Sequence, residues 1–155
     1  MNAYDPEMAA RVWQRVQGKV PAPDSVPAVQ GLQMLIAEEW SDAAAYLNLS
    51  RRFQGRDSNL LRRLSEESQS QAACLRGIHT MAAGKSPVIH TPPPAQESAE
   101  TLLRRCYSRE LGRFHEYEAR SNDSGFGPVF ARLAAQTREH CARLLELLGR
   151  LKERR

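Results

Sequence analysis

The sequence is poor in the features that mark disulfide-bonded, secreted and membrane proteins. Its 3 cysteines, Cys74, Cys106 and Cys141, are far apart and show no CxxC spacing, so we predict thiols buried in helices rather than a disulfide framework. No apolar run approaches the roughly 18 residues that a membrane span needs. The first residues lack the basic and apolar segments of a signal peptide. We therefore expect a cytoplasmic protein with no membrane partner.

Signals for nucleic-acid and nucleotide binding are also missing. The net charge is +4, but the arginines are spread among acidic residues, and the only dense basic cluster is residues 150–155. Basic residues at the end of a helix complement the helix dipole, so this cluster needs no nucleic acid to explain it. The chain contains no phosphate-binding glycine loop and no nucleophile motif. We expect no nucleic-acid partner and predict no catalytic residue.

Strand patterns are absent as well, whereas apolar residues recur at helical spacing in four long segments. The predicted helices span about residues 25–53, 58–83, 95–120 and 128–152. Asp57 or Ser58 is the expected N-cap of the second helix, and Gly84 is its expected end. A short N-terminal helix and a proline-rich linker are predicted in residues 1–24, ahead of a helical domain in residues 25–155.

The connections between these segments predict how the helices pack. Short turns near residues 54–57 and 121–127 favour two hairpins of neighbouring helices. Residues 84–95 contain Pro87, Pro92, Pro93 and Pro94, which exclude a helix and suit a long crossover along the outside. Amphipathic helices bury their apolar faces together. The predicted fold is therefore all-α, an antiparallel four-helix bundle with a long crossover between its second and third helices.

Each apolar stripe is interrupted near its middle by polar residues. In the last helix, the stripe of Phe130, Leu133, Leu144 and Leu147 continues through a threonine and a histidine. Buried polar groups are costly unless they find partners, so these interruptions need an explanation. The interrupting residues of the four helices are Glu39, Ser68, Gln71, Glu110, Thr137 and His140.

The interruptions repeat between the two halves of the chain. Tyr46 follows Glu39 by seven residues, and Tyr117 follows Glu110 by seven residues. In the same way, Ser68-x-x-Gln71 matches Thr137-x-x-His140 at an offset of about 70 residues. Measured from the two hairpin turns at 1.5 Å per residue, the heights agree to roughly one helical turn. We therefore expect all six polar positions to converge at mid-bundle.

This pattern resembles the ferritin-like superfamily, and within it the rubrerythrin-type proteins. The resemblance covers about residues 26–152 and includes the strings Glu39-Trp-Ser-Asp-Ala-Ala-Ala-Tyr46 and Arg138-Glu-His-Cys141. It implies a ferritin-like bundle with one Glu on the first and third helices and a Glu-x-x-His on the second and fourth. It also implies a homodimer and a two-metal site of iron or manganese that serves oxygen or peroxide chemistry or iron handling.

The sequence departs from the family pattern at half of the ligand positions. Glu39, Glu110 and His140 match expected ligands, but Ser68 and Thr137 replace the carboxylates that would bridge two metals. Gln71 replaces the histidine of the second helix. Two divalent cations repel each other strongly without bridging anions. We therefore predict a degenerate site that holds at most one metal ion.

Three hypotheses follow from this departure. In the first, one iron or manganese ion is held by Glu39, Glu110 and His140 with Gln71, and Tyr46 and Tyr117 lie around it. In the second, the bundle is a metal-free structural or interaction protein, in which protonated His140 pairs with Glu110 or Glu39. In the third, the protein is a di-iron or manganese oxidoreductase or peroxidase that recruits Glu66, Glu67 or Glu139 through helix rotation. The remaining histidines, His79, His90 and His115, are expected at the surface.

Overall fold

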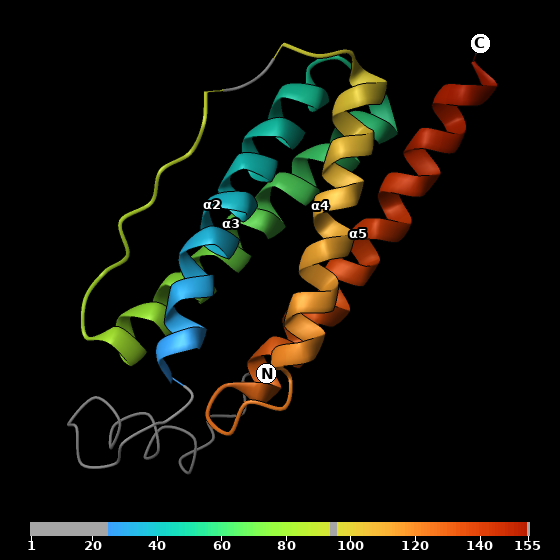
Figure 1. Ribbon diagram of the computed structural model, residues 1–155. Coiled ribbons are helices and arrows are strands. Elements are labelled where there is room, and N and C mark those ends of the chain that lie inside the picture. Colours follow the sequence, from blue (N-terminus) through green and yellow to red (C-terminus); the bar gives the residue numbers. More distant parts are fainter. Residues whose placement is uncertain (1–24, 94–95, 155) are drawn as a thin grey trace.

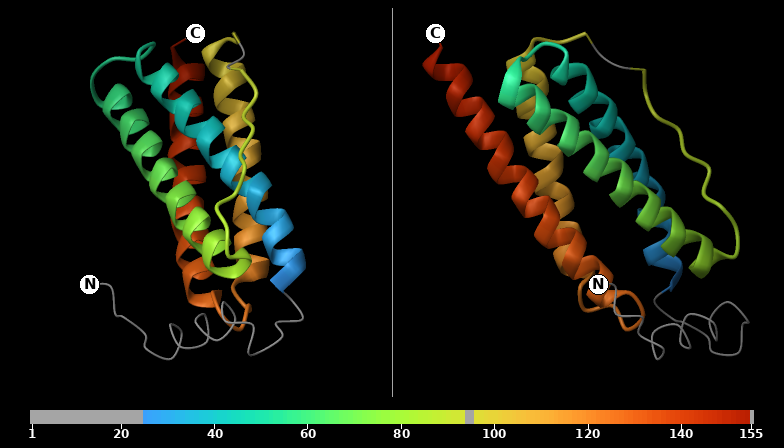
Figure 2. Two further views of the ribbon diagram at one scale, coloured as in Figure 1. Left: turned by 90° about the vertical axis from the view of Figure 1, so that its left-hand side faces the viewer. Right: turned by 180° about the vertical axis from the view of Figure 1, so that it is seen from behind.

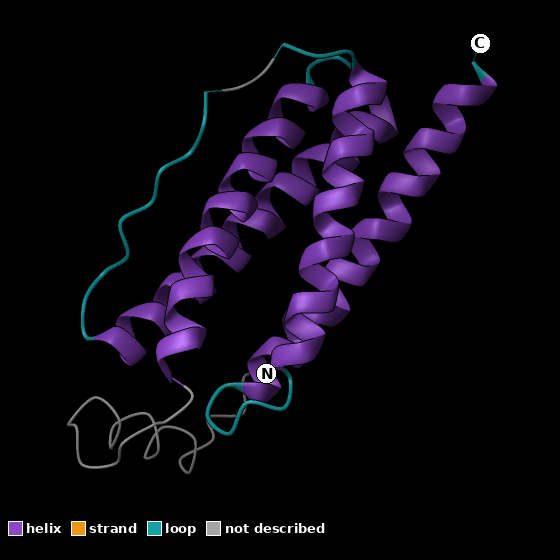
Figure 3. Cartoon of the chain, viewed as in Figure 1, coloured by secondary structure: helices purple, strands orange, loops and turns teal. Residues whose placement is uncertain are grey.

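The computed structural model describes residues 25–93 and 96–154, and these residues contain helices and loops but no strand (Figure 3). The helices are α2 (Ser25–Ser50), α3 (Gly55–Ala83), α4 (Ala99–Arg120) and α5 (Gly127–Glu153), as Figure 1 shows. The all-α prediction is confirmed. The predicted N-terminal helix and most of the predicted linker lie outside the described residues.

Three predicted helix boundaries are wrong by a few residues because local backbone geometry and hydrogen bonds set them elsewhere. Helix α2 ends at Ser50 rather than Phe53, where the Ser58 hydroxyl donates to the Ser50 carbonyl at 2.7 Å. Helix α3 already begins at Gly55, whose φ of 58° favours glycine, so neither Asp57 nor Ser58 is its N-cap. Helix α4 begins at Ala99 because the Ser98 side chain accepts from the Thr101 amide at 3.2 Å.

The predicted end of α3 at Gly84 and the predicted turn near residues 121–127 are confirmed. Gly84 ends α3 with φ 73° and donates its amide to the Thr80 carbonyl. In the second turn, Asp123 Oδ2 accepts from the Gly125 and Phe126 amides at 2.9 and 2.6 Å. Glycine is required at 127, because a Cβ there would collide with the Ser121 carbonyl. Pro128 then occupies the first turn of α5.

The four helices pack as two hairpins, α2 with α3 and α4 with α5. The hairpins meet where α2 contacts α4 and where α3 contacts α5, a packing compatible with a four-helix bundle. In Figure 1, α2 rises and α3 descends, and then α4 descends and α5 rises. Figure 2 shows the crossover passing outside the helices from the lower end of α3 to the upper end of α4. Among the described residues, no helix is long and apolar enough to cross a membrane.

The apolar core forms two clusters rather than one. The first includes Phe126 of the 121–126 turn and packs Leu32, Ile36, Leu75 and Phe130 together. The second, toward the other end of the helices, includes Leu49, Leu61, Leu103 and Leu147. Tyr117 belongs to the first cluster and Tyr46 to the second. Polar side chains fill the level between the clusters, where all four helices contribute buried residues.

Candidate functional site: a buried polar layer at mid-bundle

Ten polar side chains, each at most 1% exposed, lie on the inner faces of the four helices at mid-height. They follow the alternating three- and four-residue spacing that keeps side chains on one face of a packed helix. We call this set the polar layer. Its members are Glu39, Asp42 and Tyr46 of α2, Ser68 and Gln71 of α3, Glu110, Arg113 and Tyr117 of α4, and Thr137 and His140 of α5.

The side chains that the sequence singled out lie in this layer and contact one another. The Tyr46 hydroxyl donates to Glu110 Oε1 at 2.7 Å, and the Tyr117 hydroxyl donates to Glu39 Oε1 at the same distance. His140 Nδ1 lies 3.1 Å from the same Glu110 oxygen that Tyr46 contacts. The two tyrosine–glutamate pairs cross from α2 of one hairpin to α4 of the other, so the layer joins the two halves of the bundle.

Gln71 completes the Glu39 side of the layer. When Glu39 is ionised, the amide nitrogen of Gln71 faces it and donates to both carboxylate oxygens at 3.1 Å. The amide oxygen of Gln71 then accepts from the Thr137 hydroxyl at 3.3 Å. Ser68 Oγ is buried and has no hydrogen-bond partner among the described residues. The two positions where bridging carboxylates were expected therefore carry hydroxyls, one of them bonded to Gln71.

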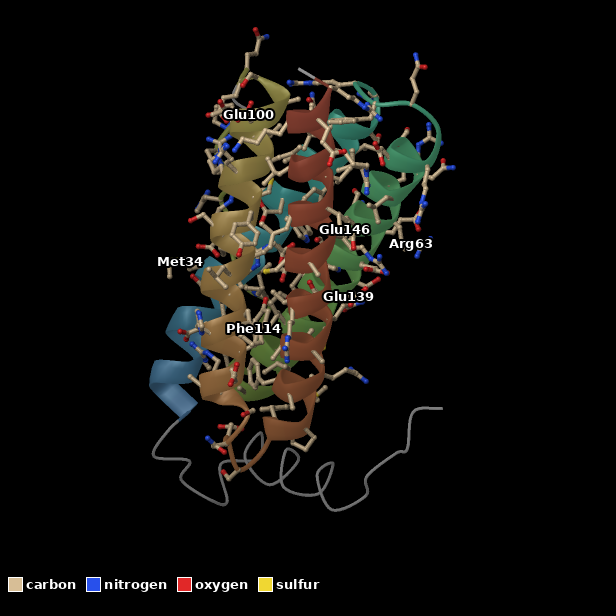
Figure 4. The ribbon with its side chains drawn as sticks, turned by 90° about the vertical axis from the view of Figure 1, so that its right-hand side faces the viewer. Met34, Arg63, Glu100, Phe114, Glu139 and Glu146 are labelled. Carbon is tan, nitrogen blue, oxygen red and sulfur yellow. The ribbon has the colours of Figure 1, made fainter. Side chains whose placement is uncertain are left out.

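The centre of the layer is Arg113, which the sequence analysis missed. Its Nε lies 3.2 Å from Glu39 Oε1, and its Nη2 lies 2.5 Å from Asp42 Oδ2 and 3.3 Å from Glu110 Oε2. The neighbouring apolar residue, Phe114, is only half-buried (labelled in Figure 4). The spacing of Leu103, Cys106, Glu110, Arg113 and Tyr117 was the available signal, because it continues the stripe through an arginine.

Asp42 is the second residue that the sequence analysis missed. It lies three residues after Glu39 on the same inner face and is fully buried. Arg113 and Arg109 hold its two carboxylate oxygens, Oδ2 and Oδ1 respectively. Its signal was again the spacing, since Leu35, Glu39, Asp42 and Tyr46 lie on one face. Asp42 and Arg113 occupy equivalent places in the two halves, one acidic and one basic.

Glu67 reaches the layer from the side. Its Oε2 lies 2.8 Å from His140 Nε2, while its side chain remains 33% exposed. This contact with His140 needs no helix rotation, because the Glu67 side chain is long enough to reach it from a lateral position. Glu66 is exposed, and Glu139 lies on the outer surface of α5 (Figure 4), where it pairs with Arg143 at 2.8 Å. Both ring nitrogens of His140 thus face carboxylates.

The two buried glutamates titrate in opposite directions. Burial, only partly offset by the charge of Arg113, raises the pKa of Glu39 from 4.5 to about 7, and nearby Glu110 adds to the rise. Burial also acts to raise the pKa of Glu110, but the hydrogen bond from His140 and the charge of Arg113 outweigh it and lower that pKa. At neutral pH, Glu110 is therefore ionised and Glu39 is close to its midpoint.

The positive and phenolic groups of the layer respond to these carboxylates. Burial opposes a charge on His140, yet its contacts with Glu110 and Glu67 raise its pKa above 6.5, so the imidazolium donates to both. Burial likewise opposes a charge on Arg113, but Glu39, Asp42 and Glu110 raise its pKa. Burial and the adjacent carboxylates raise the pKa values of Tyr46 and Tyr117. Both tyrosines therefore remain hydrogen-bond donors.

These contacts leave the expected ligands poorly suited to a metal ion. Arg113 engages both Glu39 and Glu110, and each ring nitrogen of His140 already faces a carboxylate. A metal-bound histidine instead needs one neutral ring nitrogen free for the ion. Within residues 25–93 and 96–154, no group of three or more His, Cys, Asp or Glu side chains is arranged to hold a metal ion. The side chains of this layer therefore do not fit an iron or manganese ion.

All three cysteines and the other three histidines lie outside the polar layer. Cys106 and Cys141 are buried and Cys74 is partly buried, and all three are free thiols. His90 and His115 are exposed, as expected. The prediction of a surface His79 is wrong, since it is 1% exposed and its Nδ1 lies 3.1 Å from the Lys85 carbonyl. This contact fixes the start of the crossover against α3.

Comparison with known proteins finds no matching family model, no matching curated protein and no matching solved structure. The resemblance to rubrerythrin-type proteins therefore rests on the residue pattern alone.

Proposed function

We propose that the chain is a ferritin-like bundle of the rubrerythrin type, with antiparallel helices, in which an internal ion-pair network takes the place of the metal pair. In this proposal the protein is a metal-independent structural or interaction bundle. Arg113 supplies the positive charge that balances the carboxylates of the layer. Glu39, Asp42 and Glu110 hold its guanidinium between α2 and α4.

The observation that carries this proposal is the position of Arg113 against three buried carboxylates. Buried charges of one sign are costly unless opposite charges and hydrogen bonds compensate them. A metal ion would bring a second positive centre to carboxylates that a guanidinium already engages. His140 adds a further positive charge between Glu110 and Glu67. The layer thus has internal cations in the role that metal ions would otherwise fill.

The rival hypotheses make different demands on these residues. A single iron or manganese ion would need Glu39, Glu110 and His140 to release Arg113 and Glu67. An oxidoreductase would in addition need a carboxylate to bridge two ions, and Glu67 now contacts His140 instead. The proposed function needs no such rearrangement, which is why we favour it over both.

Elemental analysis and thermal unfolding test the proposal. Purified protein incubated with Mn²⁺, or anaerobically with Fe²⁺, is expected to retain no stoichiometric metal after desalting, and its Tm should not change. About one ion per chain, lost in Glu110→Gln but kept in the exposed control Glu139→Gln, would support the single-metal hypothesis instead. About two ions per chain would support the oxidoreductase hypothesis.

A homodimer and a cytoplasmic location remain predictions. The homodimer follows only from the family resemblance, and the mass of the purified protein measured by light scattering tests it. The absence of a nucleic-acid partner likewise remains a prediction, which a binding titration at low salt would test.

A further inference from the structure

A second feature of the molecule is a pocket on the outer side of α2. It has a volume of about 800 Å³, within the range of ligand-binding cavities. Its floor is made by α2, α3 and α4, and Thr91, Pro92 and Pro93 of the crossover border it. Figure 2 shows the crossover running along this side of the bundle. The pocket is thus a groove between packed helices and a loop that follows them.

Small apolar side chains create the space in this groove. Ala43, Ala44 and Ala45 of α2 and Ala73 of α3 line it, where longer side chains would fill it. Leu102 and the half-exposed ring of Trp40 add larger apolar surface. From Trp40 to Asn48 the lining of α2 extends roughly 12 Å at 1.5 Å per residue. An elongated apolar group of that length fits the groove.

The charged residues of the groove all have one sign. Arg76, Arg105 and Arg109 line it, and its lining includes no aspartate or glutamate. Arg76 lies 5.3 Å from the centre of the Trp40 ring, at one side of the groove. Arg105 and Arg109 lie on α4, next to Leu102, and keep 39% and 27% of their side chains exposed.

The two arginines of α4 also have unused hydrogen-bonding capacity. Glu97 pairs with Arg105 at 2.9 Å and Asp42 pairs with Arg109, each through one terminal nitrogen. The Nε atoms of both are buried and lack an acceptor in the part of the chain that the structure describes. Buried donors are rarely left without a partner. Guanidinium groups bind carboxylates by charge and hydrogen bonds, and the exposed parts of both side chains are open to a ligand in the groove.

We propose that this groove binds a small amphipathic anion, with a carboxylate head at Arg105 and Arg109 and an apolar body along the alanines of α2. The head is recognised by charge and by hydrogen bonds from the guanidinium groups. The body is recognised by burial of apolar surface against Ala44, Leu102 and Trp40. This site adjoins the polar layer through Arg109, which pairs with Asp42, but no member of the layer lines it, so it can exist whether or not the proposed function of that layer is correct.

Calorimetric titration of the full chain with decanoate, decanol and acetate tests the proposal. Decanoate is expected to bind at one site per chain. Decanol lacks the charged head and acetate lacks the body, so each should bind at least about tenfold more weakly. Equal binding of decanoate and decanol would overturn the proposal, as would the absence of decanoate binding.

Two variants locate the site. Ala44→Trp fills the groove at an exposed position of α2 and is expected to abolish decanoate binding. Arg105→Gln should weaken binding about tenfold, whereas Arg104→Gln, which removes the neighbouring exposed arginine paired with Glu100, should leave it unchanged. Circular dichroism checks that each variant is folded. Unchanged binding in folded Ala44→Trp would contradict this location and the proposal with it.

Discussion

The polar layer has two halves built on equivalent positions, and they differ in one neighbour. In the Glu110 half, Glu110 receives the Tyr46 hydroxyl and His140; in the Glu39 half, Glu39 receives the Tyr117 hydroxyl and Gln71. Both glutamates are fully buried, both accept from a tyrosine at 2.7 Å, and both contact Arg113. Yet the pKa of Glu110 is lowered and that of Glu39 is raised to about 7.

This difference shows that the charge of the neighbouring groups, rather than burial, decides whether each glutamate is ionised at neutral pH. Burial is the largest influence on both pKa values and acts in the same direction on each. At Glu110, His140 and Arg113 together outweigh burial, whereas at Glu39 Arg113 offsets it only in part and the neighbouring Gln71 is neutral. Besides the two tyrosines, the polar layer contains five ionisable groups, three carboxylates and two cations. A proton on Glu39 brings these five groups to charge balance.

The largest expected effect comes from Arg113, which both halves share. Arg113→Met replaces the arginine with an unbranched apolar side chain, which retains part of its packing. It leaves three buried carboxylates without their common cation. We expect a loss of about 5 kcal/mol in the free energy of unfolding at pH 7, since breaking a buried ion pair leaves uncompensated charge. Urea unfolding measures this loss.

The control for Arg113→Met is Arg104→Met, which removes an arginine whose side chain is 61% exposed and should change stability little. If Arg113→Met does not fold at pH 7, unfolding at pH 5 provides the measurement, because protonated carboxylates need the cation less. A loss below about 1 kcal/mol at both pH values would show that the two halves do not depend on a shared cation.

The sequence was sufficient to predict the four helices and part of the polar layer. Apolar periodicity, Gly84, Pro128 and the prolines of the crossover are local signals, and they predicted the four helices within a few residues. The six interrupting polar positions stood out because each breaks an apolar stripe. Ser98 and Gly55 shifted two boundaries because a cap and a positive φ depend on local hydrogen bonds that periodicity does not encode.

Arg113, Asp42 and Glu67 could not be found in the same way. Arginine and aspartate are usually exposed, so the sequence alone favours their apolar neighbours Phe114 and Ala43 as the residues of the inner face. Their burial depends on pairing with each other across α2 and α4, which only the packed structure brings together. Glu67 lies off the inner face, and its contact with His140 depends on side-chain reach rather than on helical spacing.

The next expected effect separates the Glu110 half from the Glu39 half. Glu110→Gln should lower the free energy of unfolding by about 4 kcal/mol at pH 7, because it leaves His140 and Arg113 without a buried anion. A carboxyl with a lowered pKa stabilises the fold above its unfolded value, 4.5, and this contribution is lost as the pH falls through the folded pKa. The loss in the free energy of unfolding caused by Glu110→Gln should therefore be smaller at low pH. Denaturant unfolding from pH 3.5 to 8 measures this loss. A cost independent of pH would contradict an ionised Glu110.

Glu39→Gln should have the opposite pH dependence. The folded state holds the Glu39 proton up to a pKa of about 7, whereas the unfolded state releases it near 4.5. The wild type therefore loses stability as the pH rises between these values, and the neutral variant does not. The free energy of unfolding of the variant, relative to that of the wild type, should therefore rise by about 3 kcal/mol from pH 4.5 to pH 8. A parallel pH dependence in Glu39→Gln and Glu110→Gln would mean that the halves do not differ.

The smallest expected effect comes from making the halves alike. Gln71→His gives Glu39 the kind of neighbour that Glu110 has in His140, and the pKa of Glu39 should then fall well below 7. The resulting change in stability at pH 6 should be only about 1 kcal/mol, because a new hydrogen bond replaces an existing one. The carboxyl carbon of Glu39, followed by NMR from pH 4 to 8, measures the pKa directly. Ser70→His, at an exposed position of α3, is the control and should leave the titration unchanged. If Gln71→His also leaves it unchanged, then the opposite pKa shifts arise from the placement of Arg113 between the halves and not from His140.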